Sequence, residues 1–136
     1  MKKNGKISLL LLIAFIICVI AFCSFMVILE QMPRVQLDKS INKVCYDEIP
    51  KNIINAIVSV EDKRYWNHHG VDFLRTFKAT INYLNPKSNI YDGGSTITQQ
   101  VIKNVTGNWE TTPKRKAIEI IKAINLERDY SKKEII

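Results

Sequence analysis

The segment GGSTITQQ (residues 93–100) is the most informative stretch for the fold of this sequence. It contains two glycines, three hydroxyl side chains and two adjacent glutamines, and Ile97 is its only apolar residue. A buried strand would not be this polar, and a solvated linker does not need paired glutamines. Ser95 or Thr96 is predicted to cap a helix that begins here. The glycines allow a ligand to approach the backbone, and the free N–H groups of a helix start favour an anion.

The side chains of this segment supply many hydrogen-bonding groups without adding charge. Lys103 follows three residues after the last of them, on a similar helical face, and Asn104 comes next. The spacing of a phosphate-binding P-loop is absent. The alternative to a ligand site is a capped helix whose polar side chains bind no ligand. The uncharged candidates for ligand contact are Ser95, Thr96, Thr98, Gln99 and Gln100.

A second polar segment, EDKRYWNHHGVD (residues 61–72), precedes it. Glu61 and Asp62 are adjacent carboxylates at the end of an apolar helix. Partial burial and a like-charged neighbour would both raise the pKa of Glu61. Such a shift suits a general base, although an ordinary charged helix end remains the alternative.

The same segment carries two histidines and a glycine. His68 and His69 are neighbours, and no third ligand has metal-binding spacing, so a hydrogen-bonded structural histidine is favoured over a metal site. Gly70 permits a backbone turn immediately after the histidines.

A third segment, KRKAIE (residues 114–119), combines cations with a carboxylate. Arg115 and Lys116 lie four and three residues before Glu119, which is the spacing of helical ion pairs. Three cations at a helix N-terminus oppose the helix macrodipole. A bound pyrophosphate would offset this repulsion, so an anion site is predicted here.

Apolar periodicity and breakers predict a mostly α-helical domain of at least four helices. The helix after Pro50 is expected to be mostly buried, and the next is expected to stop at Asn85-Pro86. The apolar side chains in the segment 73–84 are interpreted as part of the core, and contact with a membrane leaflet is the alternative. The chain stops on two isoleucines expected to be exposed, which suggests a fragment. The predicted helical segments are residues 51–66, 72–85, 95–105, 113–130 and 131–136.

The N-terminal part predicts a membrane anchor. Residues 7–29 form an uncharged run of 23 residues, long enough to cross about 30 Å of hydrocarbon. Three lysines in residues 1–6 favour a cytoplasmic N-terminus, with the rest of the chain extracytoplasmic. A cleaved signal peptide is the alternative, but the run is too long and lacks a clean cleavage site. Residues 30–49 then form a connector, and residues 50–136 form the domain.

The charge balance points to an anionic partner. From residue 30 onward the chain has 17 Lys and Arg against 13 Asp and Glu, a net charge of +4. This suits phospholipid headgroups or a phosphorylated substrate, and an extracytoplasmic location argues against nucleic acid. Cys45 is the only cysteine outside the apolar run, so no internal disulfide is predicted there.

The three polar segments together resemble glycosyltransferase family 51, the peptidoglycan glycosyltransferase domain of class A penicillin-binding proteins and of monofunctional transglycosylases. The motif ED-x-x-F-x-x-H-x-G resembles residues 61–70, and G-x-STITQQ followed by KN matches residues 93–104. The motif RK-x-x-E matches residues 115–119. Lys132 and the two final isoleucines are similar to the opening of a fourth motif, whose remainder is missing.

The sequence departs from the family pattern in three ways. Tyr65 stands where Phe is usual, and Thr111 stands where many members have Arg. The rest of the fourth motif and the closing helices are missing, so the chain is expected to be a C-terminally truncated domain. These departures leave the activity of this chain open.

The resemblance implies a lysozyme-like fold and a bacterial cell-wall function. It implies that lipid II is polymerised into glycan strands by inverting transfer, with release of undecaprenyl pyrophosphate. Glu61 and Glu119 would be the catalytic residues, and Asp62, His68 and Gly70 would support them. Glu119 could also hold Mg²⁺ or Mn²⁺, the divalent cation expected from the family. The implied substrate- and pyrophosphate-binding residues are Ser95, Thr96, Thr98, Gln99, Gln100, Lys103, Asn104, Arg115, Lys116 and Lys132.

The implied partners are lipid II, the growing glycan strand, the bacterial membrane and other cell-wall synthesis proteins. Two alternatives remain. The first is an inactive membrane-anchored fragment or scaffold. The second is a lysozyme-like muralytic enzyme, although finished glycan has no pyrophosphate for the basic residues to bind.

Overall fold

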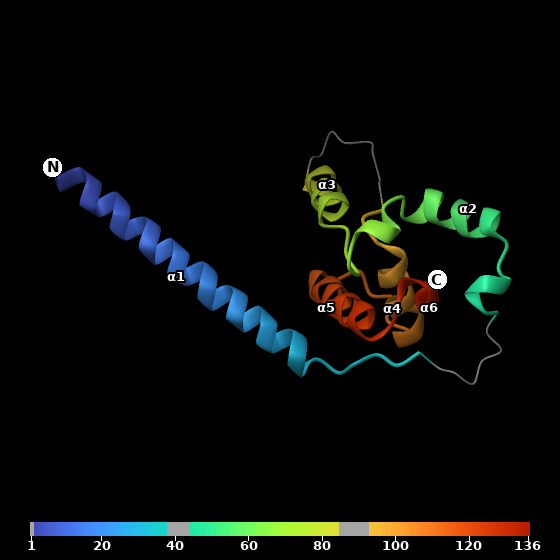
Figure 1. Ribbon diagram of the computed structural model, residues 1–136. Coiled ribbons are helices and arrows are strands. Elements are labelled where there is room, and N and C mark those ends of the chain that lie inside the picture. Colours follow the sequence, from blue (N-terminus) through green and yellow to red (C-terminus); the bar gives the residue numbers. More distant parts are fainter. Residues whose placement is uncertain (1, 38–43, 85–92) are drawn as a thin grey trace. The chain divides into compact units, whose positions relative to one another are not determined.

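The computed structural model describes residues 2–37, 44–84 and 93–136 and divides the chain into two units, Met1–Met32 and Pro33–Ile136. The first unit is one helix, α1 (Lys2–Gln31), which Figure 1 shows in blue. Its stretch Leu9–Gln31 has a mean hydropathy of 3.1 and is long and apolar enough to cross a membrane. The predicted apolar run, residues 7–29, lies within this helix.

The second unit is helical, and its described residues contain no strand element, which confirms the mostly α prediction. Helix α4 packs against α5, and the last helix ends beside them (Figure 1). The predicted stop at Asn85-Pro86 and residues 38–43 of the connector lie outside the described residues. The elements are two short 3-10 helices, η1 (Tyr46–Glu48) and η2 (Tyr65–Asn67), and five α-helices, α2 (Lys51–Glu61), α3 (Phe73–Leu84), α4 (Ile97–Thr106), α5 (Pro113–Asp129) and α6 (Lys132–Ile135).

Helix α4 begins at the position that the hydroxyl-rich segment predicted for a helix start. Thr96 is the N-cap, and its hydroxyl accepts a hydrogen bond of 3.2 Å from the backbone N–H of Gln99. The Gln99 side chain accepts one of 2.9 Å from the backbone N–H of Thr96, which completes a capping box. Gly107 ends the helix with a left-handed φ of 61°.

The two C-terminal helices also begin at predicted positions. Thr112 caps α5, and Pro113 occupies the first helical position, where its missing N–H costs nothing. Ser131 caps α6, and the Glu134 carboxylate accepts a hydrogen bond of 2.8 Å from the Ser131 backbone N–H. Local sequence is therefore sufficient to fix where these helices start.

The apolar core is divided into two clusters, and it corrects two predictions. Helix α2 was expected to be mostly buried, but only Ile54 and Val58 are buried, because a single i, i+4 stripe faces the core. The final isoleucines were expected to be exposed, but Ile135 is buried and Ile136 is half-buried. One cluster contains Val71, Ile102, Ala123, Leu126 and Ile135, and the other contains Ile54, Val58, Tyr65 and Ile97.

The interpretation of α3 as a core helix is wrong. Phe73, Leu74 and Phe77 are exposed to 68%, 60% and 65%, and Ile81 is exposed to 50%. Spacing alone shows that these residues share a helix face, but it does not show what covers that face. Within the described residues, α3 therefore carries an uncovered apolar face.

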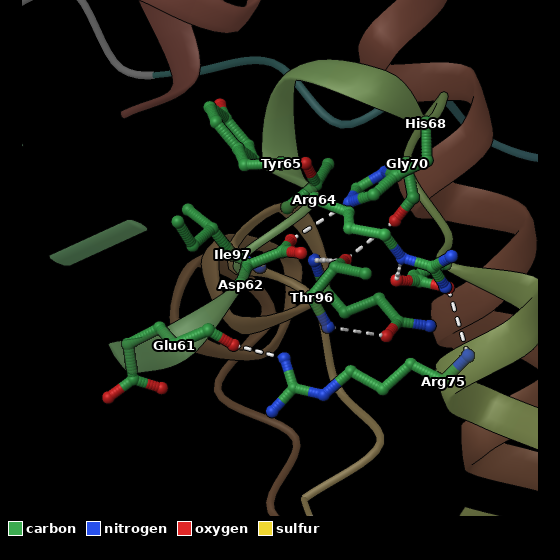
Figure 2. Close-up of polar contacts among 12 residues, drawn as sticks. Glu61, Asp62, Arg64, Tyr65, His68, Gly70, Arg75, Thr96 and Ile97 are labelled. Atoms are coloured by element: carbon green, nitrogen blue, oxygen red, sulfur yellow. Dashed lines mark hydrogen bonds and ion pairs between the residues drawn. The ribbon is translucent and has the colours of Figure 1, made fainter. Parts of the chain in front are cut away.

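Gly70 determines how closely the loop before α3 approaches α5. Its φ is +79°, and a Cβ at this position would lie 2.5 Å from the backbone oxygen of Ala123. The Gly70 carbonyl accepts a hydrogen bond of 2.6 Å from the hydroxyl of Thr96 (Figure 2). A glycine therefore brings the loop, the start of α4 and the middle of α5 together.

Candidate active site

Asp62 connects the end of α2 to the start of α4. Its side chain is fully buried, and its Oδ2 accepts hydrogen bonds from the backbone N–H of Ile97, at 3.2 Å, and from Nε2 of His68, at 2.9 Å (Figure 2). The prediction of a hydrogen-bonded histidine is confirmed, and the residue is His68. Asp62, which follows Glu61, and His68, which lies two residues before Gly70, therefore tie this loop to the start of α4.

Glu61 is the last residue of α2, and its side chain is exposed, so the predicted partial burial is wrong. Its Oε2 accepts a hydrogen bond of 2.8 Å from Nε2 of Gln100 on α4. Arg75 of α3 donates to its backbone carbonyl, as Figure 2 shows. The Glu61 carboxylate thus faces solvent beside α4, where a ligand could reach it, while neighbouring elements hold its backbone.

The hydroxyl and amide groups of the first turn of α4 divide into two sets. Thr96, Thr98 and Gln99 are buried, and their side chains form hydrogen bonds within the protein. Ser95 and Gln100 are half-buried. The second pair is therefore more accessible to a ligand than the first three.

Arg115 and Lys116 converge on the buried carboxylate of Glu119. Arg115 pairs with Oε2, and Lys116 Nζ lies 2.6 Å from Oε1. Lys116 also donates to the hydroxyl of Ser95 at 2.8 Å and contacts Gln99 at 3.5 Å. The predicted i, i+3 and i, i+4 pairs both form, and Lys116 joins them to the start of α4.

A hollow of about 180 Å³ lies between α4 and α5. Lys103 borders it, and the Lys103 ammonium lies 4.3 Å from the ring centroid of Trp109, a cation–π distance. Asn104 is exposed on the next position of α4. The hollow is lined by Ile102, Lys103, Thr106, Asn108, Arg115, Ile118, Glu119 and Lys122.

Lys132, the remaining predicted cation, has different partners. Its Nζ lies 2.7 Å from Oε1 of Glu127, 3.4 Å from Nδ1 of His68 and 4.2 Å from the ring centroid of Tyr65. The Tyr65 hydroxyl donates to the Lys132 backbone carbonyl at 2.8 Å, and burial raises the Tyr65 pKa. Lys132 is thus held by an ion pair, a histidine and an aromatic ring.

Sequence reasoning missed Glu127. It accepts hydrogen bonds from Lys132 and from the hydroxyl of Thr98, and its side chain is 3% exposed. The signal was available, because Glu119, Ala123 and Glu127 follow each other at i, i+4 and i+8 on one helix face. A carboxylate on the buried stripe of a helix requires a partner.

The pair Arg64–Asp72 was also missed. Arg64 Nε donates to Asp72 at 2.8 Å, its second nitrogen pairs with the other carboxylate oxygen, and Asp72 caps α3 by accepting from the Arg75 backbone N–H at 2.9 Å. Burial raises the pKa of Asp72, but the hydrogen bonds from Arg64 and Arg75 outweigh it and lower the pKa below its usual value.

The residues present do not fit a resident divalent cation at Glu119. Its two carboxylate oxygens are occupied by Arg115 and Lys116, so a metal would have to displace both cations. Among the residues that the structure describes, no three His, Cys, Asp or Glu side chains are grouped as metal ligands. Oxygen-rich sets are what Mg²⁺ and Mn²⁺ require.

Helix α4 borders both parts of the candidate site, the Glu61 carboxylate and the cations near Glu119. Gln100 contacts the Glu61 carboxylate, and Lys103, three residues later on a similar face, borders the hollow that Arg115 also lines. A proton acceptor and a group of cations therefore border the same helix. We call Lys103, Arg115 and Lys116 the cation cluster.

Comparison with known proteins identifies the family of this chain. The transglycosylase family model matches residues 29–136. The monofunctional glycosyltransferase of Staphylococcus haemolyticus is 37% identical over 139 residues, covering 99% of this chain and 51% of that protein. Penicillin-binding protein 1F of Bacillus subtilis is 44% identical over 93 residues, which cover 68% of this chain and 13% of that protein.

Penicillin-binding protein 1A of Aquifex aeolicus is likewise 44% identical, over 94 residues that cover 68% of this chain and 13% of that protein. The chain thus spans about half the length of the monofunctional relative and a small part of the penicillin-binding proteins. The family model covers most of the chain, including all three polar segments. The chain belongs to the transglycosylase family, glycosyltransferase family 51.

Proposed function

We propose that this domain is a peptidoglycan glycosyltransferase that joins lipid II units into glycan strands and releases undecaprenyl pyrophosphate. The observation that carries the proposal is the position of the Glu61 carboxylate and the cation cluster along one helix, α4. A transfer from a lipid-linked diphosphate needs both a proton acceptor and stabilisation of the departing anion.

In this mechanism Glu61 is the general base. Its carboxylate takes the proton from the 4-hydroxyl of the acceptor N-acetylglucosamine. That oxygen attacks the anomeric carbon of the donor N-acetylmuramic acid from the face opposite the leaving group. The bond from this carbon to the diphosphate oxygen breaks, and the configuration inverts. Gln100 orients the base through its hydrogen bond to Oε2.

The diphosphate leaves with its charge stabilised by the cation cluster. Arg115 offers a planar donor group suited to phosphate, whereas Lys103 and Lys116 act as point charges. Glu119 keeps Arg115 and Lys116 oriented before the substrate binds. Since these residues do not fit a divalent cation, no step of the mechanism uses one.

The membrane delivers the lipid-linked substrate. We propose that α1 spans the bilayer once with a cytoplasmic N-terminus, which leaves the domain extracytoplasmic. The uncovered apolar face of α3, with Phe73, Leu74 and Phe77, then contacts the outer leaflet. This arrangement would keep the site near the diphosphate of a substrate whose lipid tail stays in the bilayer.

The alternatives are separated by one assay. The protein is incubated with lipid II, and glycan product and released undecaprenyl pyrophosphate are quantified. Polymer in the wild-type protein and none in Glu61→Gln supports the proposal. Absence of polymer with normal folding supports the inactive scaffold, and cleavage of finished glycan strands supports the muralytic enzyme.

A further inference from the structure

A buried network connects three parts of the chain that are distant in sequence. We define it as Asp62, His68, Lys132, Glu127 and Thr98. Hydrogen bonds join Asp62 with His68 and His68 with Lys132. Lys132 also donates to Glu127, which accepts from Thr98 as well. The network closes through the backbone, because Ile97, next to Thr98, donates its N–H to Asp62.

The two partners of His68 indicate which ring nitrogen carries the hydrogen. The ammonium of Lys132 can only donate, so Nδ1 of His68 accepts at 3.4 Å. The other nitrogen, Nε2, therefore carries the hydrogen and donates it to the Asp62 carboxylate at 2.9 Å. A neutral His68 with the hydrogen on Nε2 satisfies both neighbours at once.

Asp62 depends on that hydrogen. Its Oδ1 is buried and has no hydrogen-bond partner in the described part of the chain, so Oδ2 receives its two side-chain contacts. Loss of the His68 donor would leave a buried carboxylate held by the Ile97 N–H alone, which is costly. The junction between α2 and α4, where Glu61 and Gln100 meet, would then depend on that single hydrogen bond.

Glu127 is the group that keeps Lys132 in place. The Lys132 side chain is 18% exposed, and Glu127 is the carboxylate with which it pairs at 2.7 Å. Removing one partner of a buried pair leaves an uncompensated charge, which favours deprotonation or outward rotation of the lysine. In either case the lysine would no longer donate to Nδ1 of His68.

We propose that Glu127 is a positioning residue for Glu61: by pairing with Lys132 it keeps the Lys132 ammonium against Nδ1 of His68, which holds the ring with Nε2–H toward Asp62 and thereby supports the α2–α4 junction that carries the base. The kinetic part of this inference rests on the proposed function, whereas the histidine part does not. The charged and titratable groups near His68 are Asp62 and Tyr65 from its own segment, Asp72 before α3, Glu127 on α5 and Lys132 on α6.

The histidine form is measured directly by ¹⁵N NMR of the histidine-labelled 136-residue chain in detergent micelles. The sequence has only two histidines, and the exposed His69 is assigned with His69→Gln. Wild-type His68 is expected to show the neutral Nε2–H pattern at pH 7. An imidazolium or an Nδ1–H pattern in the wild-type protein would overturn the inference without any variant.

Glu127→Gln then tests the role of the charge, because it preserves size and an acceptor for Thr98. We expect the neutral pattern, with a bare Nδ1 and Nε2–H, to be lost, because the lysine no longer donates to Nδ1. We expect kcat to fall by about tenfold to a hundredfold, the scale of a small misplacement at a reacting centre. KM should change by less than about threefold because the cation cluster is untouched. The matched control is Glu110→Gln, an exposed glutamate outside the network, which should leave the spectrum and kcat at wild-type values.

The outcomes separate the two proposals. A Glu127→Gln protein with the wild-type His68 spectrum and kcat overturns the positioning role. A spectrum that changes while kcat does not also overturns it, because the network would then not control the base. If the wild-type protein does not polymerise lipid II, the proposed function fails, while the NMR comparison still tests the assignment of His68 by Glu127.

Discussion

The side-chain amide of Gln100 donates a hydrogen bond of 2.8 Å to the carboxylate of Glu61, although 39 residues separate them in the chain. The contact joins the end of α2 to the first turn of α4. It is made by an exposed carboxylate rather than a buried one. The orientation of the Glu61 side chain therefore depends on α4, the helix that also borders the cation cluster.

Replacing Glu61 by Gln should abolish polymerisation of lipid II and leave substrate binding largely intact. Loss of a general base costs on the order of 10²–10⁴-fold in rate. The exposed side chain packs against little, so the melting temperature should stay close to that of the wild-type protein. Near-normal polymer yield in this variant would exclude Glu61 as the base.

Replacing Arg115 by Ala should weaken binding of lipid pyrophosphate by about tenfold to a hundredfold, the range expected for one charged hydrogen bond. Binding of a sugar analogue that lacks the diphosphate should change much less. Lys114→Ala, an exposed neighbour on the same turn, is the control for charge alone. Equal losses for both ligands would contradict the role of Arg115.

Three glycine-to-alanine variants should form a graded stability series. Gly93→Ala should be nearly neutral, because a Cβ there meets no atom of the described residues within 4 Å. Gly107→Ala has open space but a φ of +61°, so it should cost about 1 kcal/mol of backbone strain. Gly70→Ala adds a contact of 2.5 Å with the Ala123 carbonyl to a φ of +79° and should cost several kcal/mol.

Denaturant unfolding of the three proteins tests this order. A Gly70→Ala protein as stable as Gly93→Ala would show that the loop does not approach α5 as described.

Asp72 should make folding stability depend on pH at the acid end. Its pKa in the folded state lies below the usual value of 3.8, so the unfolded chain binds its proton first as the pH falls. Its contribution is therefore complete above pH 3.8 and is lost as the pH drops through the lower folded-state pKa. The mutation Asp72→Asn should reduce stability at pH 7 and flatten this acid dependence.

The control for that experiment is Asp47→Asn, an exposed carboxylate of η1. Unfolding free energies are compared from pH 7 down to pH 3. If Asp72→Asn left the acid dependence of the unfolding free energy unchanged, the Arg64–Asp72 pair would not be its source.

The apolar face of α3 should contribute to membrane contact and not to folding. Phe77 is 65% exposed, so Phe77→Ser should lower stability far less than the ~3–5 kcal/mol typical of a buried aromatic truncation. Polymerisation in lipid vesicles should fall more than polymerisation in detergent. A large loss of stability would restore the core interpretation of this helix.

The amino-acid sequence was sufficient for the local parts of this structure. Thr96, Thr112 and Ser131 start their helices where hydroxyl residues precede helical patterns, and the Arg115 and Lys116 pairs with Glu119 follow from helical spacing. These features depend only on residues three or four positions apart, so the local sequence is enough to specify them.

The tertiary structure alone decided which of those groups face solvent and which face each other. The exposed face of α3, the exposed Glu61 and the buried Glu127 could not be deduced from periodicity, because a helical pattern defines a face without defining what covers it. The contacts Gln100–Glu61 and Lys132–His68 join residues 39 and 64 positions apart. Such contacts exist only after the helices have packed, since packing of α4 against α5 sets the distances between their side chains.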